Sequence, residues 1–358
     1  MGLSKRWKLN IGEMKPGRRN LITDVEGVRV GHVTIDNGNT HTGVTAVLPH
    51  PGNLFQDKVM AASQVLNGFG KTIGLVEVDE MGFLETPILL TNTFGVGAAA
   101  NGLIDYMLDE NTEIGRTTGT VNPVVCECND GRINDIRKRA VTEAHAREAI
   151  ARAAEEFAEG DVGAGRGMVC HQLKGGIGSA SRTFEIGEQE YTLGALVLSN
   201  HGLYRDLLVA GRRISEEISK EGLTEVSQEE QEQQENFEER DKGSIIMILA
   251  TDAPLNERQL KRICRRCAIG LGREGSYMMN GSGDIALAFT TANRIPHTSS
   301  EGILPVQMLH DDQMDILFRA SAEVIEESVL SSMFHAKECM ERSGKTVRSL
   351  ADLWELLV

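Results

Sequence analysis

The segment that begins at Ser244, SIIMILATD, is a continuous apolar run of the kind that forms a strand buried on both faces. It closely follows an acidic stretch, EVSQEEQEQQENFEE, which holds seven glutamates, four glutamines and no basic residue. That stretch is too polar to bury, so about residues 223–242 are expected to form a solvated linker or an exposed extension of the preceding helix. A core strand thus starts directly at a serine, after a linker that the fold does not need. This arrangement favours cleavage of the chain between Gly243 and Ser244.

Strand and helix patterns occur on both sides of that point. Short runs bounded by glycine or turn residues predict strands in ITDVEGVRVGHVTI, TGVTAVLP, TIGLVEV, PILLTN, TVNPVVCE, LGALVLSN and IALAFTT. Helices are expected in DKVMAASQVLNG, GVGAAANGLIDYMLDE, AVTEAHAREAIARAAEEF, RDLLVAGRRISEEISKE, NERQLKRICRRCAIGL, MDILFRASAEVIEESVLSSMFHAKECM and SLADLWELL. Neither half looks complete alone, so residues 1–358 are expected to form one interleaved α/β domain, which the cut divides into 1–243 and 244–358.

The formal net charge of −15 argues against nucleic acid and anionic membranes as partners. No apolar run is long enough to cross a bilayer, and the basic N-terminus lacks the apolar core of a secretory signal, so we expect a cytoplasmic protein. The six cysteines suit that reducing compartment. Two cysteine pairs could be combined into a four-thiolate zinc site: Cys126 with Cys128, and Cys264 with Cys267. The second pair lies in a helical pattern, so plain buried thiols are favoured, and neither a metal nor a cofactor is expected.

The common catalytic signatures are missing, because no GxSxG or HExxH occurs and the nine histidines are scattered. A serine hydroxyl needs a base before it becomes a nucleophile. An α-amino group titrates near ~8, well below lysine, so an amino-terminal serine can carry its own base. Cleavage at Gly243–Ser244 creates that arrangement, and a glycine before the serine permits the strained backbone that lets the hydroxyl reach the preceding carbonyl. Taken alone, a Gly-Ser pair before a strand is a weak signal.

Three further segments carry groups that such chemistry needs. In NGSGD, Ser282 and Asp284 are two residues apart and are expected on the same side of an extended chain, where a carboxylate can orient a hydroxyl. Asn200 ends the strand LGALVLSN and could donate to a developing oxyanion. Glu127 ends another strand, where it could hold a substrate's ammonium group. For each of them the alternative is an ordinary turn or strand end, in which the polar side chain bonds nearby backbone.

These segments coincide with those of a known family. The chain resembles the self-processing L-aminopeptidase/D-esterases and β-peptidyl aminopeptidases from Ile22 to near Lys337. The segments that carry the resemblance are ITDVEGVRVGH, NGFGKTIGLVEV, ETPILLTNT, NPVVCECNDGRINDI, VGAGRGMVCHQLKGGIGSASR, KGSIIMILATDAPL and GSGDIALAFTT.

The resemblance implies a four-layer αββα sandwich, self-cleavage into an α and a β chain, and a tetramer of such αβ units. It places the nucleophile on Ser244, the second serine and its acidic partner on Ser282 and Asp284, and the oxyanion asparagine on Asn200. The amine-binding glutamate falls on Glu127. The implied substrate is a short peptide, amide or ester with a free amine.

Two residues depart from the family pattern. His201 stands where many relatives carry tyrosine, and Arg166 replaces a small or hydroxylated residue; either could alter substrate preference. Two other functions stay open at this point. An acyltransferase of the ornithine acetyltransferase type shares the fold and the self-cleavage, but it uses threonine as the nucleophile, and Ser244 argues against it. A non-catalytic, uncleaved relative is the other alternative.

Overall fold

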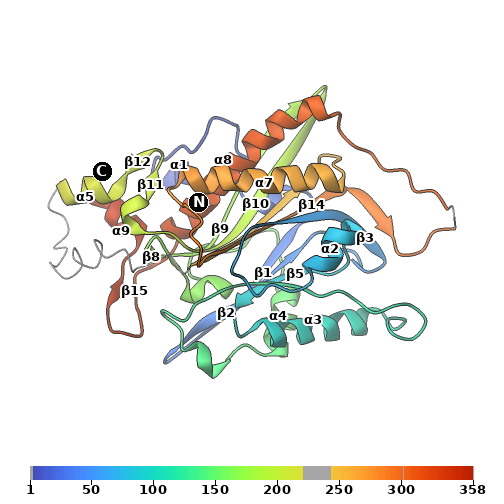
Figure 1. The fold of residues 1–358 in the computed structure, drawn as a ribbon, viewed down its shortest axis with the longest axis horizontal. Coiled ribbons are helices and arrows are strands. Elements are labelled where there is room, and N and C mark those ends of the chain that lie inside the picture. Colours follow the sequence, from blue (N-terminus) through green and yellow to red (C-terminus); the bar gives the residue numbers. More distant parts are fainter. Residues whose placement is uncertain (1–2, 221–242, 301, 358) are drawn as a thin grey trace.

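The computed structural model describes residues 3–220, 243–300 and 302–357, so the linker expected over 223–242 lies outside them. Two β-sheets are stacked on each other, and helices lie against the outer face of each sheet (Figure 1). No helix within the described ranges is long and apolar enough to cross a membrane.

The smaller sheet has the strand order β1-β2-β5-β6. Its strands are β1 (Arg29–Asn37), β2 (Thr40–Leu48), β5 (Ile88–Asn92) and β6 (Val124–Cys128). β1 and β2 form an antiparallel hairpin, β2 pairs antiparallel with β5, and β5 pairs parallel with β6. The parallel pair needs a crossover connection, which α3 (Val96–Glu110) provides. Together with α4 (Glu143–Ala151), this helix covers the outer face of the sheet.

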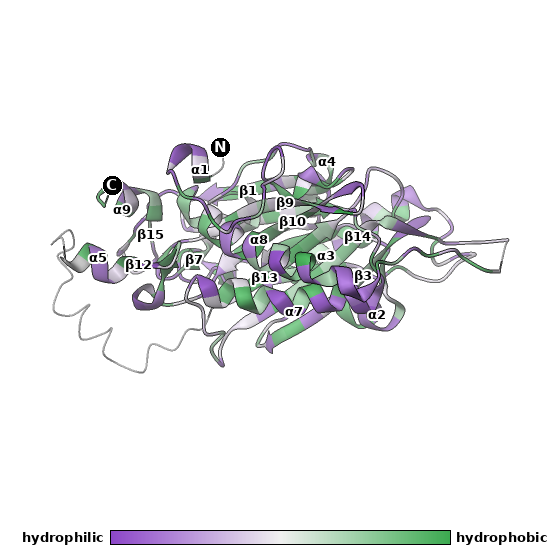
Figure 2. Ribbon diagram, turned by 90° about the horizontal axis from the view of Figure 1, so that it is seen from above, coloured by the Kyte–Doolittle hydropathy of each residue, from purple (hydrophilic) through white to green (hydrophobic). Residues whose placement is uncertain are grey.

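The larger sheet has the strand order β4-β3-β14-β13-β10-β9. Its strands are β4 (Phe83–Leu84), β3 (Asp57–Gly68), β14 (Gly283–Pro296), β13 (Ser244–Thr251), β10 (Gln189–Asn200) and β9 (Gly176–Ile186). β13 lies inside the sheet, parallel to β14 on one side and antiparallel to β10 on the other. The central strands are predominantly apolar (Figure 2).

The apolar run after Ser244 is explained by this position. Ile245, Met247 and Leu249 face the core under α7 (Glu257–Arg273) and α8 (Met314–Phe334), which cover the larger sheet. The alternate residues of β13 belong to a second core between the two sheets. A third core lies under α3 and α4. These three cores separate four layers, so the expected αββα sandwich is confirmed.

The helix α8 approaches β9 at backbone contact distance. A Cβ atom on Gly178 would lie 1.9 Å from the carbonyl oxygen of Ser328 and 2.5 Å from the backbone nitrogen of Ser332. Buried Arg182 of the same strand also binds α8, through Glu323 (3.1 Å) and Glu327 (2.7 Å). Close packing and a buried ion pair thus fix this helix on the sheet.

Three expectations for local structure are wrong. DKVMAASQVLNG is the strand β3 and not a helix, because pairing with β14 and β4 outweighs its helix-like composition. The expected strand TIGLVEV is largely replaced by the helix α2 (Leu75–Met81), which starts and ends at glycines with positive φ. The expected helix RDLLVAGRRISEEISKE begins only at Ile214, since a turn at Ala210 and Gly211, both with positive φ, forms a small hairpin before it.

The contact between α8 and β9 gives a stability prediction. Gly178→Ala should lower the free energy of unfolding by about 1–3 kcal/mol, because the added methyl group forces α8 away from the sheet. The control is Gly97→Ala in α3, where a Cβ has no atom within 4 Å and alanine favours the helix. Thermal denaturation followed by circular dichroism measures both variants. Equal melting temperatures for the two would contradict the close contact.

Candidate active site

Ser244 is the first residue of β13 and is fixed by both neighbouring strands. In register it faces Asn200, the last residue of β10, and Gly283, the first residue of β14. Its side chain is buried, with 5% of the residue exposed. Pairing on both sides therefore brings three segments from distant parts of the sequence to one end of the larger sheet.

The hydroxyl of Ser244 lies beside the peptide bond that precedes it. Oγ donates a hydrogen bond to the carbonyl oxygen of Gly243 at 2.7 Å. The backbone N–H of Gly283 donates to that same carbonyl oxygen at 3.2 Å and to the Ser244 Oγ at 3.3 Å. A serine hydroxyl and a backbone donor thus meet at one carbonyl group, and both kinds of group take part in acyl-transfer chemistry.

Ser282 and Asp284 lie together at the start of β14. Ser282 Oγ donates to Asp284 Oδ1 at 2.5 Å, and both side chains are buried. The two side chains are therefore on the same side of the chain, as their spacing predicts. Gly283 lies between them and contacts Ser244, so the pair is adjacent to the serine.

Both the oxygen and the nitrogen of the Asn200 side-chain amide are hydrogen-bonded to backbone groups. Its Oδ1 accepts from the backbone nitrogen of Val169 at 2.9 Å, and its Nδ2 donates to the carbonyl oxygen of Asn129 at 3.1 Å. An amide nitrogen carries two N–H groups, and Asn129 uses one of them. The amide is thus oriented by the segments that flank it.

Glu127 belongs to the smaller sheet, at the end of β6. Its Oε1 accepts from the backbone nitrogen of Lys71 at 2.8 Å, and its Oε2 accepts from the hydroxyl of Thr93. Gly70 lies between this carboxylate and Gly283, the neighbour of Ser244 in β14. A Cβ on Gly70 would lie 3.9 Å both from Glu127 Oε1 and from the Cα of Gly283. The structure therefore brings all the expected site residues to the same end of the sandwich.

Cys128, which follows Glu127 in β6, is completely buried. Burial raises the pKa of Cys128 well above its ordinary value, and the nearby carboxylates of Glu127 and Asp284 raise it further. The four-thiolate zinc site does not form, because Cys126 and Cys128 lie in the core between the sheets. Cys264 and Cys267 lie in the other core, under α7.

Next to Asn200, a cluster that sequence reasoning missed is completely buried. Glu274, just after α7, binds His201 at 2.8 Å between Oε1 and Nε2, and its Oε2 contacts Nε2 of His171. Cys170 Sγ lies 3.9 Å from His201 Nδ1. Burial by itself lowers the pKa of His171, but the Glu274 carboxylate outweighs it and raises this pKa to about 9. In the sequence only the departure at His201 hinted at this cluster, and Glu274 is 73 residues away from it.

The other departure from the family pattern lies apart from these residues. Arg166 forms ion pairs with Asp36 at 2.9 Å and with Asp161 at 3.2 Å. These pairs tie its loop to β1 and to the segment before the loop. No described contact links Arg166 to Ser244.

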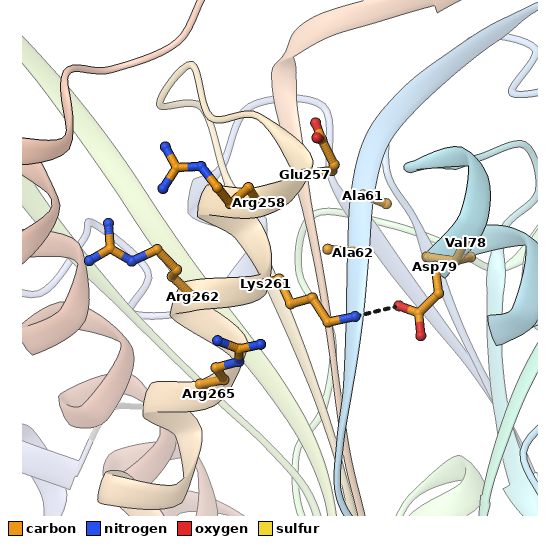
Figure 3. A pocket seen from close by; sticks show the side chains of 9 residues that line it. All are labelled: Ala61, Ala62, Val78, Asp79, Glu257, Arg258, Lys261, Arg262 and Arg265. Carbon is orange, nitrogen blue, oxygen red and sulfur yellow. Dashed lines mark hydrogen bonds and ion pairs between the residues drawn. The ribbon is translucent and has the colours of Figure 1, made fainter.

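A cavity between α7 and α2 is separate from Ser244 (Figure 3). Its basic side chains come from α7, and each already has a partner. Lys261 binds Asp79 at 3.3 Å, and Arg258 binds Asp311 at 2.9 Å. Arg265 bonds the neutral side chain of Gln64 at 3.1 Å, and no described contact links the cavity to Ser244. The residues that line it are Ala61, Ala62, Val78, Asp79, Glu257, Arg258, Lys261, Arg262 and Arg265.

Known proteins resemble this chain over most of its length. Peptidase family S58 matches residues 20–347. A β-peptidyl aminopeptidase of Sphingosinicella microcystinivorans is 37% identical over 347 residues, which are 94% of this chain and 86% of that protein.

Solved structures agree with this match. A crystal structure of a Pyrococcus horikoshii protein has a TM-score of 0.89 and 47% identity, covering 99% of this chain and 97% of that chain. The L-aminopeptidase D-Ala-esterase/amidase of Ochrobactrum anthropi has a TM-score of 0.85 and 34% identity, covering 96% and 95%. That structure is described as a new variant among the Ntn-hydrolase fold. The chain belongs to peptidase family S58 and is a hydrolase of the aminopeptidase type.

Proposed function

We propose that the chain cleaves its own Gly243–Ser244 bond and then uses the new amino-terminal Ser244 as the nucleophile of an aminopeptidase. The observation that supports this most is the contact of Ser244 Oγ with the Gly243 carbonyl oxygen, at 2.7 Å. The Gly283 N–H on the same oxygen polarises the carbonyl and stabilises the charge that develops during attack.

The cleavage proceeds through an ester. Ser244 Oγ attacks the carbonyl carbon of Gly243, the C–N bond breaks, and the hydroxyl proton passes to the departing Ser244 nitrogen. Water then hydrolyses the ester, which leaves a carboxylate on Gly243 and a free hydroxyl and amine on Ser244. The amine, with a pKa near ~8 in solution, can then take the proton of its own hydroxyl when a substrate is attacked.

The neighbouring residues assist this nucleophile. Asp284 orients the Ser282 hydroxyl, which we place in the proton path next to Ser244. The N–H of Gly283 and the amide of Asn200 are the donors for the oxyanion that forms on the substrate. One such donor is typically worth ~3 kcal/mol in the transition state.

Glu127 is proposed to bind the free amine of the substrate. Its carboxylate is 2% exposed and lies across Gly70 from Gly283, so an ammonium group bound there would place the next carbonyl near Ser244. The substrate class is therefore a short peptide, amide or ester with a free amine. The acyltransferase alternative is disfavoured, because its relatives use threonine at the position of Ser244.

We also propose that the protein assembles as a tetramer of αβ units, as the family resemblance implies, and that it is cytoplasmic, a compartment that suits its free cysteines. Light scattering coupled to gel filtration measures the mass of the assembly.

Self-cleavage gives the first functional prediction. The purified protein should run as two bands on a denaturing gel, and Edman sequencing of the smaller fragment should give Ser-Ile-Ile-Met. Ser244→Ala should give one folded, inactive, full-length chain, whereas the exposed control Ser343→Ala should be cleaved normally. A single full-length band for the wild-type protein would support the non-catalytic alternative instead.

The Ser282–Asp284 pair gives the second prediction. Asp284→Asn keeps the size of the side chain but removes the charge that orients Ser282. The variant should lose about 10²-fold or more in kcat, the order expected for a residue that acts in proton transfer. Its melting temperature should change little by comparison. Unchanged kcat and unchanged self-cleavage would show that the acidic partner is another residue.

The third prediction separates substrate binding from self-cleavage. A charge-assisted hydrogen bond is worth roughly 1.5–3 kcal/mol, so Glu127→Gln should lower kcat/KM for free-amine substrates about tenfold to a hundredfold. Cleavage at Gly243–Ser244 should persist, because that reaction involves no free amine. Hydrolysis of N-acetylated amides by the wild-type protein as fast as free-amine amides would refute an amine site.

A further inference from the structure

We propose that Cys170, His171, His201 and Glu274 form a closed binding site for one divalent transition-metal ion of the zinc type. These residues come from three places: the end of β7 (Val169–Cys170), the residue after β10, and the residue after α7. All four are buried, and none is more than 2% exposed. The proposal does not depend on the proposed function, and it departs from the sequence-based expectation of no metal.

The distances fit a metal with a small coordination sphere. The potential ligand atoms of Cys170, His171 and His201 all lie within 4.8 Å of one another. Cys170 Sγ and His201 Nδ1 are 3.9 Å apart. Two such donors on a tetrahedral zinc ion are about 3.5 Å apart, so Cys170 and His201 need to approach only slightly, whereas His171 and Glu274 need to separate.

In the neutral form of His171, one ring nitrogen carries a hydrogen and the other carries a lone pair. Nδ1 lies 3.0 Å from the carbonyl oxygen of Leu203, which can only accept, so Nδ1 carries the hydrogen. In the neutral ring Nε2 is then an acceptor, and it faces an acceptor oxygen of Glu274. Two acceptors at contact distance share a proton, because a nitrogen and an oxygen on one tetrahedral zinc ion lie about 3.3 Å apart. A metal ion that binds here displaces that proton and moves the two groups apart.

The same reasoning applies to His201. Its Nε2 donates to Glu274 Oε1 at 2.8 Å, which leaves the lone pair of Nδ1 directed toward Cys170 Sγ. A histidine whose second nitrogen donates to a carboxylate, or to a backbone carbonyl, is the usual form of a metal-bound histidine. Both histidines of the cluster are oriented in this way.

Charge and donor type narrow the choice of ion. A thiolate on Cys170 and the carboxylate of Glu274 together carry two negative charges, which one divalent ion neutralises. Neutrality matters here because an uncompensated charge is unfavourable at a buried site. Sulfur and imidazole donors favour zinc and its transition-metal neighbours over magnesium or calcium. Four protein donors leave no open position, so the site is structural.

The site adjoins Asn200, so a bound metal ion would orient that residue. Val169, the residue before Cys170, donates to Asn200 Oδ1, and His201 directly follows Asn200. A metal ion bound here would link β7, the end of β10 and the end of α7 around this asparagine. It would therefore hold the Asn200 amide in place without touching a substrate.

Cobalt substitution tests the site with a direct spectroscopic signal. The full-length protein is stripped with a chelator, loaded with Co²⁺ or Zn²⁺, and desalted. We expect one metal ion per chain by mass spectrometry, together with the thiolate-to-cobalt charge-transfer band and the visible bands of tetrahedral cobalt. Failure to retain metal would show that only protons fill the cluster, and retained cobalt without the thiolate band would show that the metal binds elsewhere; either result overturns the proposal.

Matched variants locate the ligand. Cys170→Ser should lose the charge-transfer band and the rise in melting temperature that Zn²⁺ gives the wild-type protein. Cys264→Ser, which removes a buried thiol that bonds the carbonyl oxygen of Ala62 and has no described contact with the cluster, should keep both. A Cys170→Ser protein that still shows the band would overturn the assignment. The spectrum of the wild-type protein alone decides the outcome if the variant does not fold.

Discussion

Backbone pairing on both sides of Ser244 is the constraint from which the rest of the site follows. An interior strand has no freedom to slide, because a shift of one residue would turn every side chain of β13 to the opposite core. Ser244 is therefore fixed beside Asn200 and Gly283 by hydrogen bonds that serve the whole sheet. Ser244, the proposed nucleophile, is therefore positioned at the end of an interior strand, as Asn200 and Gly283 are at the ends of the two neighbouring strands.

Close packing of α8 on β9 supports the larger sheet from its outer face. α8 lies so close to β9 that a Cβ on Gly178 would force the helix to shift, and Arg182 crosses from the sheet to two glutamates of the helix. A buried arginine is acceptable because carboxylates and backbone carbonyls surround its guanidinium group. Packing of this kind resists local adjustment, so the sheet that holds Ser244 is supported from its outer face as well.

The sequence predicted what short-range patterns determine. The two-sided burial of β13 follows from its continuous apolar run, and the contact of Ser282 with Asp284 follows from their spacing. Sequence-based prediction failed where pairing with a distant segment determines the local structure. β3 is a strand because it pairs with β14, more than 200 residues later in the chain. The Cys170–Glu274 cluster was invisible for the same reason: no pattern within a single segment links residues that three separate elements bring together. The local geometry at Ser244 likewise needed the three-dimensional register of β10 and β14.

The strand order also determines when the site can exist during synthesis. β3, β9 and β10 leave the ribosome long before β13 and β14, which must later insert between β3 and β10. Until then the nascent chain exposes unpaired strand edges, a state prone to aggregation. Gly283, whose N–H contacts the Gly243 carbonyl, is synthesised after Gly243 and Ser244. For the self-cleavage proposed above, a ribosome-bound chain that ends before β14 lacks the Gly283 donor, so translation order by itself would delay the reaction until the sheet is complete.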